Sequence, residues 1–432
     1  MAEIIPEMHT LGSINPHTLF IDLNGATYRE INDARAGNGS PRGWEIYEHE
    51  ARHWRDLLAT VWGRSYLDLL FRTYDAILKT PNNRMDTTFA QVLELFDRDR
   101  SILFPSYYKY VLPEVRALPR DERWSMAFST GIKVASDGSL DERQPFIFVR
   151  FDAGPVHFAR QPVSEGALLE GRALAAEDAA TTAWLAMRTE GEDVVTWRLK
   201  EVALRDQLYH PELTTYSVAS HVVAYATGIR DIRENLNLTH KLADVALNLV
   251  GTGFSQLTPP ADFGMPARSR LKGFRKSSNR GYAFCCLAFA MREVVELAGT
   301  GRQAIEAAMQ RAGLPTIAKV YSDAATVISR RPGRAAAEPR LAAIRLKLIT
   351  AGATLHRIPD FDANVADLCP TGPGAAPLIG DSDCNVFSLG ASPLDMAESE
   401  FLHECHERYR EVLRSALRAA RGLEFEFTDF VY

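Results

Sequence analysis

The residues best suited to chemistry lie in the stretch EIYEHEARHWRDLLATVWG, where His49, Glu50 and His53 form the pattern H-E-x-x-H. On a helix, residues four positions apart lie on one face, so the two imidazoles can reach a single metal ion. Glu50 lies beside them, where its carboxylate can take a proton from a water molecule that the ion activates. The pattern therefore predicts a Zn2+ site with its own general base.

The sequence around the pattern predicts the helix that this geometry requires. Periodic apolar residues indicate a helix from Trp44 to about Thr60, and we expect Gly63 to end or break it. Bulky residues such as Trp54 predict that this helix is buried. Polar groups on a buried helix need partners, because unpaired polar groups are costly there. A metal ion is one such partner, and hydrogen bonds within the core are the alternative.

A catalytic zinc site normally has three protein ligands, so a third must come from elsewhere in the chain. The stretch LLEGRALAAED, on a helix expected after Ser164, contains Glu170 in an E-G-x-A context. With H-E-x-x-H and this later glutamate, the chain resembles the zincin metallopeptidases, specifically the gluzincin type. The resemblance implies Glu170 as the third ligand. Glu177, on the same helix face, is an alternative, and Glu165 is a weaker substitute.

The same resemblance implies a zinc-dependent hydrolase, in the first place a peptidase acting on peptide or protein substrates, with Glu50 as general base. The chain departs from the thermolysin-like pattern, which has an Asp four residues after the ligand, where this sequence has Leu174. Support for the imidazole of His49 must then come from another carboxylate. Asp56, on the helix face of His49, and Glu177 are the candidates for this hydrogen bond.

Two alternatives remain open. Glu50-x-x-His53 is also an E-x-x-H motif, and ESEFLHECHE contains a second copy, Glu400-x-x-His403. Two such motifs with two further glutamates are typical of a di-iron carboxylate bundle, although the strands expected between residues 125 and 163 fit that fold poorly. The second alternative is a non-catalytic binding module that keeps the metal for structure.

Two further polar features have no assigned role. Tyr209, His210, Tyr216 and His221 are available to stabilise an oxyanion, although packing is the simpler interpretation for each. The stretch RSRLKGFRKSSNR, from Arg268 to Arg280, concentrates six basic residues. A single aromatic residue, Phe274, does not make a pattern of interleaved aromatic and basic residues, so the stretch is more typical of a solvated loop than of a nucleic-acid site.

The sequence patterns along the whole chain predict an α+β fold that is mostly helical. We expect a zincin-like catalytic domain over residues 1–258 and a mainly helical C-terminal region over residues 259–432. A second helix is expected in SYLDLLFRTYDAILKT, another after the N-cap Ser164, and mostly helix from about residue 195 onward. The expected strands are TLFIDLNGATYREI, the two arms of RWSMAFSTGIKVASDGSLDERQPFIFVRFD, GPVHFARQPV and the terminal LEFEFTDFVY.

Composition limits the function classes. A chain of 432 residues that is 46% hydrophobic can bury a large core, and a net charge of -6 gives no global attraction to nucleic acid or membranes. Apolar runs such as GYAFCCLAFAM are shorter than the roughly 18 residues of a membrane helix, and the N-terminus lacks a secretory pattern. Five cysteines without a CxxC pair indicate a reduced, cytoplasmic protein, and the abundant Ala and Arg suggest a bacterial one. The sequence leaves the oligomeric state and the cleavage specificity open.

Overall fold

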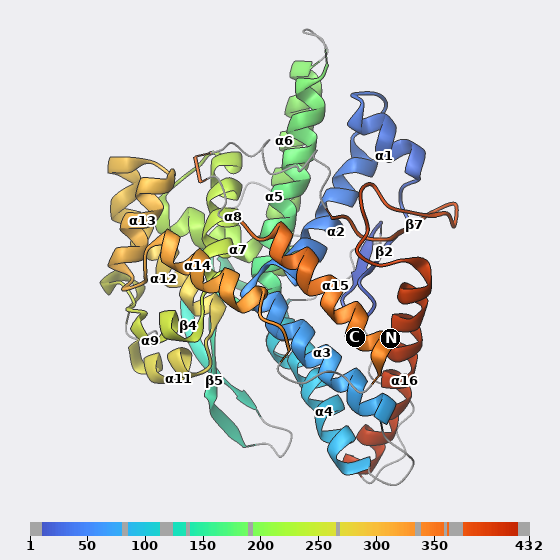
Figure 1. Cartoon of the computed structure of the whole chain (residues 1–432). Coiled ribbons are helices and arrows are strands. Elements are labelled where there is room, and N and C mark those ends of the chain that lie inside the picture. Colours follow the sequence, from blue (N-terminus) through green and yellow to red (C-terminus); the bar gives the residue numbers. More distant parts are fainter. Residues whose placement is uncertain are drawn as a thin grey trace.

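The computed structural model describes residues 11–79, 85–112, 124–134, 139–188, 193–264, 268–332, 338–357, 361–362 and 375–421. Helices form most of the described chain, and two small sheets lie on different sides of the helical body (Figure 1). The expected mostly helical α+β class is therefore confirmed. No helix among the described residues is both long and apolar enough to cross a membrane.

The first sheet joins distant parts of the chain. Its strands, in spatial order, are β1 (Ser13–Asn15), β2 (Phe20–Leu23), β7 (Ile379–Asp381) and β8 (Val386–Phe387). Strands β2 and β7 pair in parallel, whereas the other two pairings are antiparallel. A long connection must separate two parallel neighbours, and here almost the whole chain provides it.

The second sheet is antiparallel and local in sequence. Its strands, in spatial order, are β3 (Tyr110–Val111), β6 (Val156–Pro162), β5 (Leu140–Ala153) and β4 (Trp124–Val134). Phe146, Phe148 and Phe151 are buried on β5, which packs against the helices. The strands expected in this region are confirmed.

Helices make up the rest of the described chain. The N-terminal ones are α1 (Tyr28–Arg35), α2 (Arg42–Ala59), α3 (Val61–Lys79), α4 (Met85–Asp97) and the π-helical η1 (Arg98–Leu103). The central ones are α5 (Glu165–Ala186), α6 (Asp193–Leu208), α7 (Thr214–Thr227) and α8 (Ile232–Asn248). The later ones are α9 (Gly251–Gln256), α11 (Leu271–Lys276), α12 (Arg280–Ala298), α13 (Arg302–Arg311), α14 (Ile317–Ile328), α15 (Pro339–Leu355) and α16 (Met396–Arg421).

Helix α5 is the central element of the fold. Ser164 caps it as expected, with its hydroxyl accepting a hydrogen bond from the Ala167 amide at 3.2 Å. The helix is buried on nearly every side and packs against α2, α7 and α8 (Figure 1). A helix that is apolar all round belongs in a core, so any acidic side chain on it must find a buried partner.

Two large hydrophobic clusters form the core. One combines the second sheet with α5, α7, α8 and α12, and the other combines the first sheet with α2, α3, α15 and α16. Both clusters draw residues from both sides of residue 258. The boundary expected there does not coincide with a division of the hydrophobic core.

The break between α2 and α3 lies at Thr60, not at Gly63. Thr60 has an extended backbone, and its hydroxyl donates to the Asp56 carbonyl and accepts from the Gly63 amide. A β-carbon on Gly63 would lie 2.3 Å from the carbonyl oxygens of Asp56 and Leu57. Gly63 therefore lets α3 start close to the end of α2, and the expectation that it ends the helix is wrong.

Two other expected elements differ from the structure or lie outside it. In TLFIDLNGATYREI only β2 is a strand, because Thr27 and Glu30 form a capping box that starts α1 at Tyr28. The terminal strand expected in LEFEFTDFVY lies outside the described residues.

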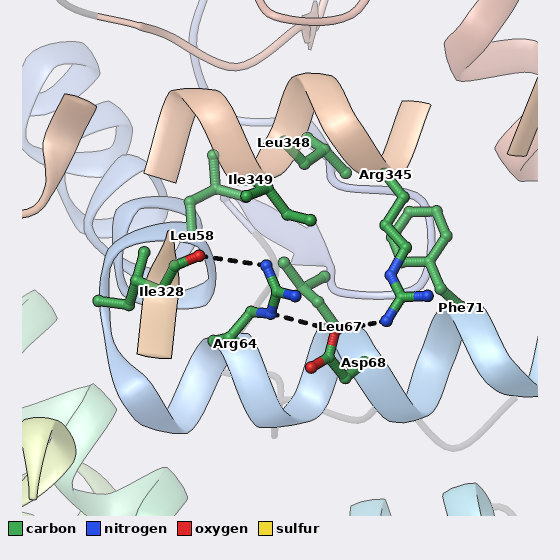
Figure 2. A pocket seen from close by; sticks show the side chains of 9 residues that line it. All are labelled: Leu58, Arg64, Leu67, Asp68, Phe71, Ile328, Arg345, Leu348 and Ile349. Atoms are coloured by element: carbon green, nitrogen blue, oxygen red, sulfur yellow. Dashed lines mark hydrogen bonds and ion pairs between the residues drawn. The ribbon is translucent and has the colours of Figure 1, made fainter. Parts of the chain in front are cut away.

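Helix α3 is fastened to α14 and α15 by two arginines around one carboxylate (Figure 2). Asp68 accepts from Arg345 at 2.7 Å and forms an ion pair with Arg64 at 3.1 Å. Arg64 also donates to the carbonyl oxygens of Ile328 and Arg330, at 3.1 and 2.8 Å. The cavity between these helices measures ≈ 10 Å³, room for about one water molecule, so it serves packing rather than ligand binding.

Helix α15 packs tightly on α2 at Gly352, where an added β-carbon would lie 2.2 Å from the Leu58 carbonyl oxygen. We predict that Gly352→Ala forces the two helices apart and lowers the free energy of unfolding by roughly 1–3 kcal/mol. Gly251→Ala is the matched control, because nothing lies within 4 Å of its added β-carbon. Urea denaturation of both variants tests the prediction, and equal midpoints would contradict it.

Candidate metal centre

Helix α2 carries His49 and His53 on the side that faces α5, which carries Glu170, and Glu50 lies next to them toward strand β1. The expected helix over this stretch is confirmed. Glu50 and His53 are buried, and His49 is partly buried. The close packing of α5 is achieved through small residues. A β-carbon on Gly171 would lie 3.1 Å from the Ala219 β-carbon on α7 and 3.2 Å from the Thr239 methyl on α8.

Three potential ligand atoms converge between the two helices. The Nε2 atom of His49 lies 3.4 Å from Oε2 of Glu170, and Nε2 of His53 lies 3.6 Å from the same oxygen. One atom from each of the three residues lies within 4.8 Å of the others. Ligands bound to tetrahedral zinc at about 2.0–2.2 Å lie about 3.3–3.5 Å apart, and the two histidine-to-glutamate separations are close to that spacing. Among the described residues, this is the one group of three or more His, Cys, Asp or Glu side chains with such geometry.

The hydrogen bonding around these atoms is incomplete. The Glu170 side chain is 0% exposed, and neither of its oxygens has a hydrogen-bond partner among the described residues. Both ring nitrogens of His53 are also buried without a hydrogen-bond partner there. Buried polar atoms are almost always paired, so the orphaned atoms on converging ligands fit a bound cation.

The charges at the site favour a cation. Burial opposes ionisation of Glu170, but the imidazoles of His53 and His49 outweigh it and lower the pKa of Glu170 to about 2. Burial likewise opposes protonation of His49, yet its contacts with Glu170 and Glu177 raise its pKa well above the usual value. Carboxylates that hold a proton on an imidazole also hold a metal ion in its place.

Glu50 lies beside the three ligands without joining them. Its pKa is raised by burial, while His49 and His53 act in the opposite direction. The backbone of Ile14, on strand β1, hydrogen-bonds with its carboxylate, and the Oε2 atom has no hydrogen-bond partner among the described residues. One oxygen free and the other held by the backbone is a suitable arrangement for a positioned base.

A buried polar cluster fixes the hairpin that brings Ile14 to Glu50. In the turn between β1 and β2, His17 Nε2 lies 3.1 Å from Asp99 on η1, and His17 Nδ1 lies 3.2 Å from Nδ1 of His406 on α16. Tyr66 on α3 donates to Asp99 at 2.9 Å. The hairpin is therefore tied to three helical elements, which makes the position of Glu50 depend on the C-terminal helix.

The carboxylate that supports His49 is Glu177, not Asp56. Glu177 Oε2 lies 3.3 Å from Nδ1 of His49, the ring nitrogen turned away from Glu170. Such a contact orients an imidazole whose other nitrogen binds a metal. Asp56 is fully buried, and its Oδ1 accepts from Arg52 at 2.8 Å and pairs with Arg172 at 3.1 Å. The expectation that Asp56 hydrogen-bonds to His49 is therefore wrong, because closer guanidinium groups take its carboxylate.

Arg172 continues this network to helix α8. Its Nη2 atom lies 2.5 Å from Oδ1 of Asp244, and Tyr321 donates to the other oxygen of Asp244. One arginine thus neutralises a carboxylate on α2 and another on α8 from its place on α5, two residues after Glu170. Sequence reasoning missed this network, because an isolated arginine gives no spacing signal.

The remaining glutamate considered as a ligand has a structural role. Glu165, at the start of α5, accepts from the Trp62 indole at 2.7 Å and from Arg98 at 2.6 Å.

The centre keeps some solvent access on the side of His49 and Glu177, whose side chains are 13% and 29% exposed.

Of the four residues considered for oxyanion stabilisation, Tyr216 has a ring contact with the centre, with its centroid 6.3 Å from that of His49. Tyr209 and His221 pack instead on Trp124, and His221 also hydrogen-bonds to the Leu208 carbonyl. His210 is exposed at the start of a short helix.

The second E-x-x-H motif does not join this site. Glu400 and His403 are exposed on α16, and His403 Nδ1 hydrogen-bonds to the Ser399 carbonyl at 2.9 Å. Neither residue belongs to the convergent group on α2 and α5.

Comparisons with known proteins add no family to this description. Protein-family models, curated proteins and solved structures each give no match to the chain.

The geometry ranks the carboxylates for metal binding. We predict that Glu170→Ala removes most of the zinc affinity, and that Glu177→Ala weakens it about 10- to 100-fold by freeing His49. Glu400→Gln is the control and should bind zinc normally. Titration against a competing chelator gives the ranking. A larger loss with Glu177→Ala would make Glu177 the ligand, and a loss with Glu400→Gln would favour the di-iron alternative.

The buried network gives a stability prediction. Arg172→Met leaves the carboxylates of Asp56 and Asp244 without their shared cation, and we expect it to lower the free energy of unfolding by about 3–5 kcal/mol. Arg29→Met removes an exposed pair with Asp33 and should cost less than about 1 kcal/mol. Denaturant unfolding compares the two variants. Similar losses in both would show that the network contributes little.

Proposed function

We propose that this protein is a zinc-dependent hydrolase, specifically a peptidase of the zincin type, with His49, His53 and Glu170 as ligands and Glu50 as general base. The observation that carries the proposal is the convergence of two imidazole nitrogens on one buried carboxylate oxygen, at 3.4 and 3.6 Å, with that oxygen lacking a hydrogen-bond partner among the described residues. Three protein ligands are the usual number for a catalytic zinc and leave a fourth position for water or substrate.

The chain's own residues supply the remaining steps. When bound, zinc would lower the pKa of a coordinated water and polarise a substrate carbonyl. Glu50 accepts a proton from the attacking water and passes it to the leaving amine of the peptide bond. The Ile14 backbone holds Glu50 in place, and Glu177 keeps the His49 ring oriented. Tyr216 is the residue that we assign to the developing oxyanion.

A cytoplasmic location is part of the same proposal. The described cysteines, Cys285, Cys286, Cys384 and Cys405, are all free, and a reducing compartment keeps thiols in that state.

The main competing function is a module that holds zinc for structure alone. The raised pKa of Glu50 and its orphaned oxygen favour catalysis, because a purely structural site needs no base beside it.

Glu50→Gln tests the proposal. The substitution keeps the size of the side chain and all three ligands but removes the base, so we expect full zinc content and a 10²- to 10⁴-fold lower rate of peptide cleavage. Activity is measured as new peptide termini in a defined peptide mixture, and zinc by elemental analysis.

Each of the other outcomes supports a different function for this protein. Loss of metal in Glu50→Gln would make Glu50 a ligand and favour the di-iron alternative. A wild-type protein that holds one zinc per chain and cleaves no peptide in the mixture would be the binding module. A protein purified without any metal would exclude both the zinc site and the di-iron site.

A further inference from the structure

The basic stretch from Arg268 to Arg280 is not uniformly solvated. Arg280 is buried and donates to the Leu249 carbonyl at 3.1 Å, and Arg270 donates to the Thr130 hydroxyl at 3.3 Å. The other four cations, Arg268, Lys272, Arg275 and Lys276, line one open hollow of ≈ 570 Å³ together with two serines. The structure thus sorts the stretch into two structural arginines and four that share a site.

Helix α11 is held rigidly so that its cations face the hollow. Phe274 is fully buried and stacks on Tyr282, with ring centroids 4.1 Å apart and planes 4° from parallel. A β-carbon on Gly273 would lie 2.9 Å from the Glu142 carbonyl oxygen, which brings the helix directly against the second sheet. The inward face is therefore fixed by packing, and Lys272 and Lys276 are exposed on the other side.

Arg275 is preorganised at the edge of the hollow. Its Nε and Nη2 atoms both donate to the Leu257 carbonyl, at 2.9 and 2.7 Å. That leaves the Nη1 donors of a fixed guanidinium plane, and a donor held in place loses less entropy when it binds a ligand.

The charge of this hollow is uncompensated. None of its lining residues is acidic, and within the described chain no carboxylate forms an ion pair with any of the four cations. Four like charges in a protein of net charge -6 raise the local potential and attract a multiply charged anion.

We propose that this hollow binds a small anion that carries two or more phosphate groups. Its volume lies within the range of small-molecule sites, about 300–1,000 Å³. A nucleic-acid strand would need a longer basic track and aromatic residues for base stacking, and no aromatic residue lines the hollow. The inference is independent of the proposed peptidase activity.

Inorganic pyrophosphate is the probe. Isothermal titration of the wild-type protein should show binding, and the double substitution Lys272→Gln/Lys276→Gln should weaken it at least about 10-fold, since it removes two charge-assisted hydrogen-bond donors. The double substitution Lys319→Gln/Lys347→Gln removes the same charge elsewhere on the surface and should bind normally. Glu170→Ala should also bind normally, which separates this hollow from the metal centre.

Four results would overturn the proposal. The first is the lack of a pyrophosphate signal at millimolar concentration. The second is equal weakening in the two lysine double variants, which would indicate net charge rather than a site. The third is loss of binding in Glu170→Ala, which would place pyrophosphate on the metal. A single-stranded oligonucleotide that binds the wild type more tightly than pyrophosphate would assign the hollow to nucleic acid instead.

Discussion

The arrangement of this protein depends on one buried charge, the carboxylate of Glu170. An ionised carboxylate without exposed surface is very costly unless cations or donors surround it. Helix α5 creates that cost, because its apolar faces place it in the centre of the core. Helix α2 offsets the cost of burying this charge with two imidazoles one turn apart. The convergence of the two helices is thus favoured by electrostatics as well as by packing, and a bound metal ion would pair the Glu170 oxygens, which lack a hydrogen-bond partner among the described residues.

A second set of buried charges, centred on Arg172, pairs α5 with its neighbours α2 and α8. Arg172 lies two residues after Glu170, and its guanidinium joins Asp56 on α2 to Asp244 on α8. A buried ion network of this kind contributes little net stability compared with apolar packing, but it is strongly unfavourable when mispaired. Its effect is to fix the register of α2 against α5. That register decides whether the two imidazoles meet Glu170 or miss it.

Spacing in the sequence correctly predicted which side chains share a helix face. H-E-x-x-H placed two imidazoles together, and the N-cap Ser164 located the start of α5. Spacing did not predict what lies opposite each face. Asp56 occupies the expected face, but Arg52, four residues before it, competes for its carboxylate, and Arg172 arrives from another helix. The end of α2 near Thr60 was predicted, but the role of Gly63 was not, because Gly63 serves close packing there.

The domain boundary illustrates the same limit at a larger scale. Composition and loops suggested a division near residue 258, yet β7 pairs with β2, and α15 packs directly on α2. Helix α16 is linked to the candidate metal centre through His406, which contacts His17 in the β1–β2 turn and thereby supports the strand whose backbone hydrogen-bonds with Glu50. The late part of the chain is therefore a structural component of the metal centre. Residues 1–258 alone would lack the parallel partner of β2 and would expose the apolar side of α2, so segments from both sides of residue 258 are needed to position Glu50.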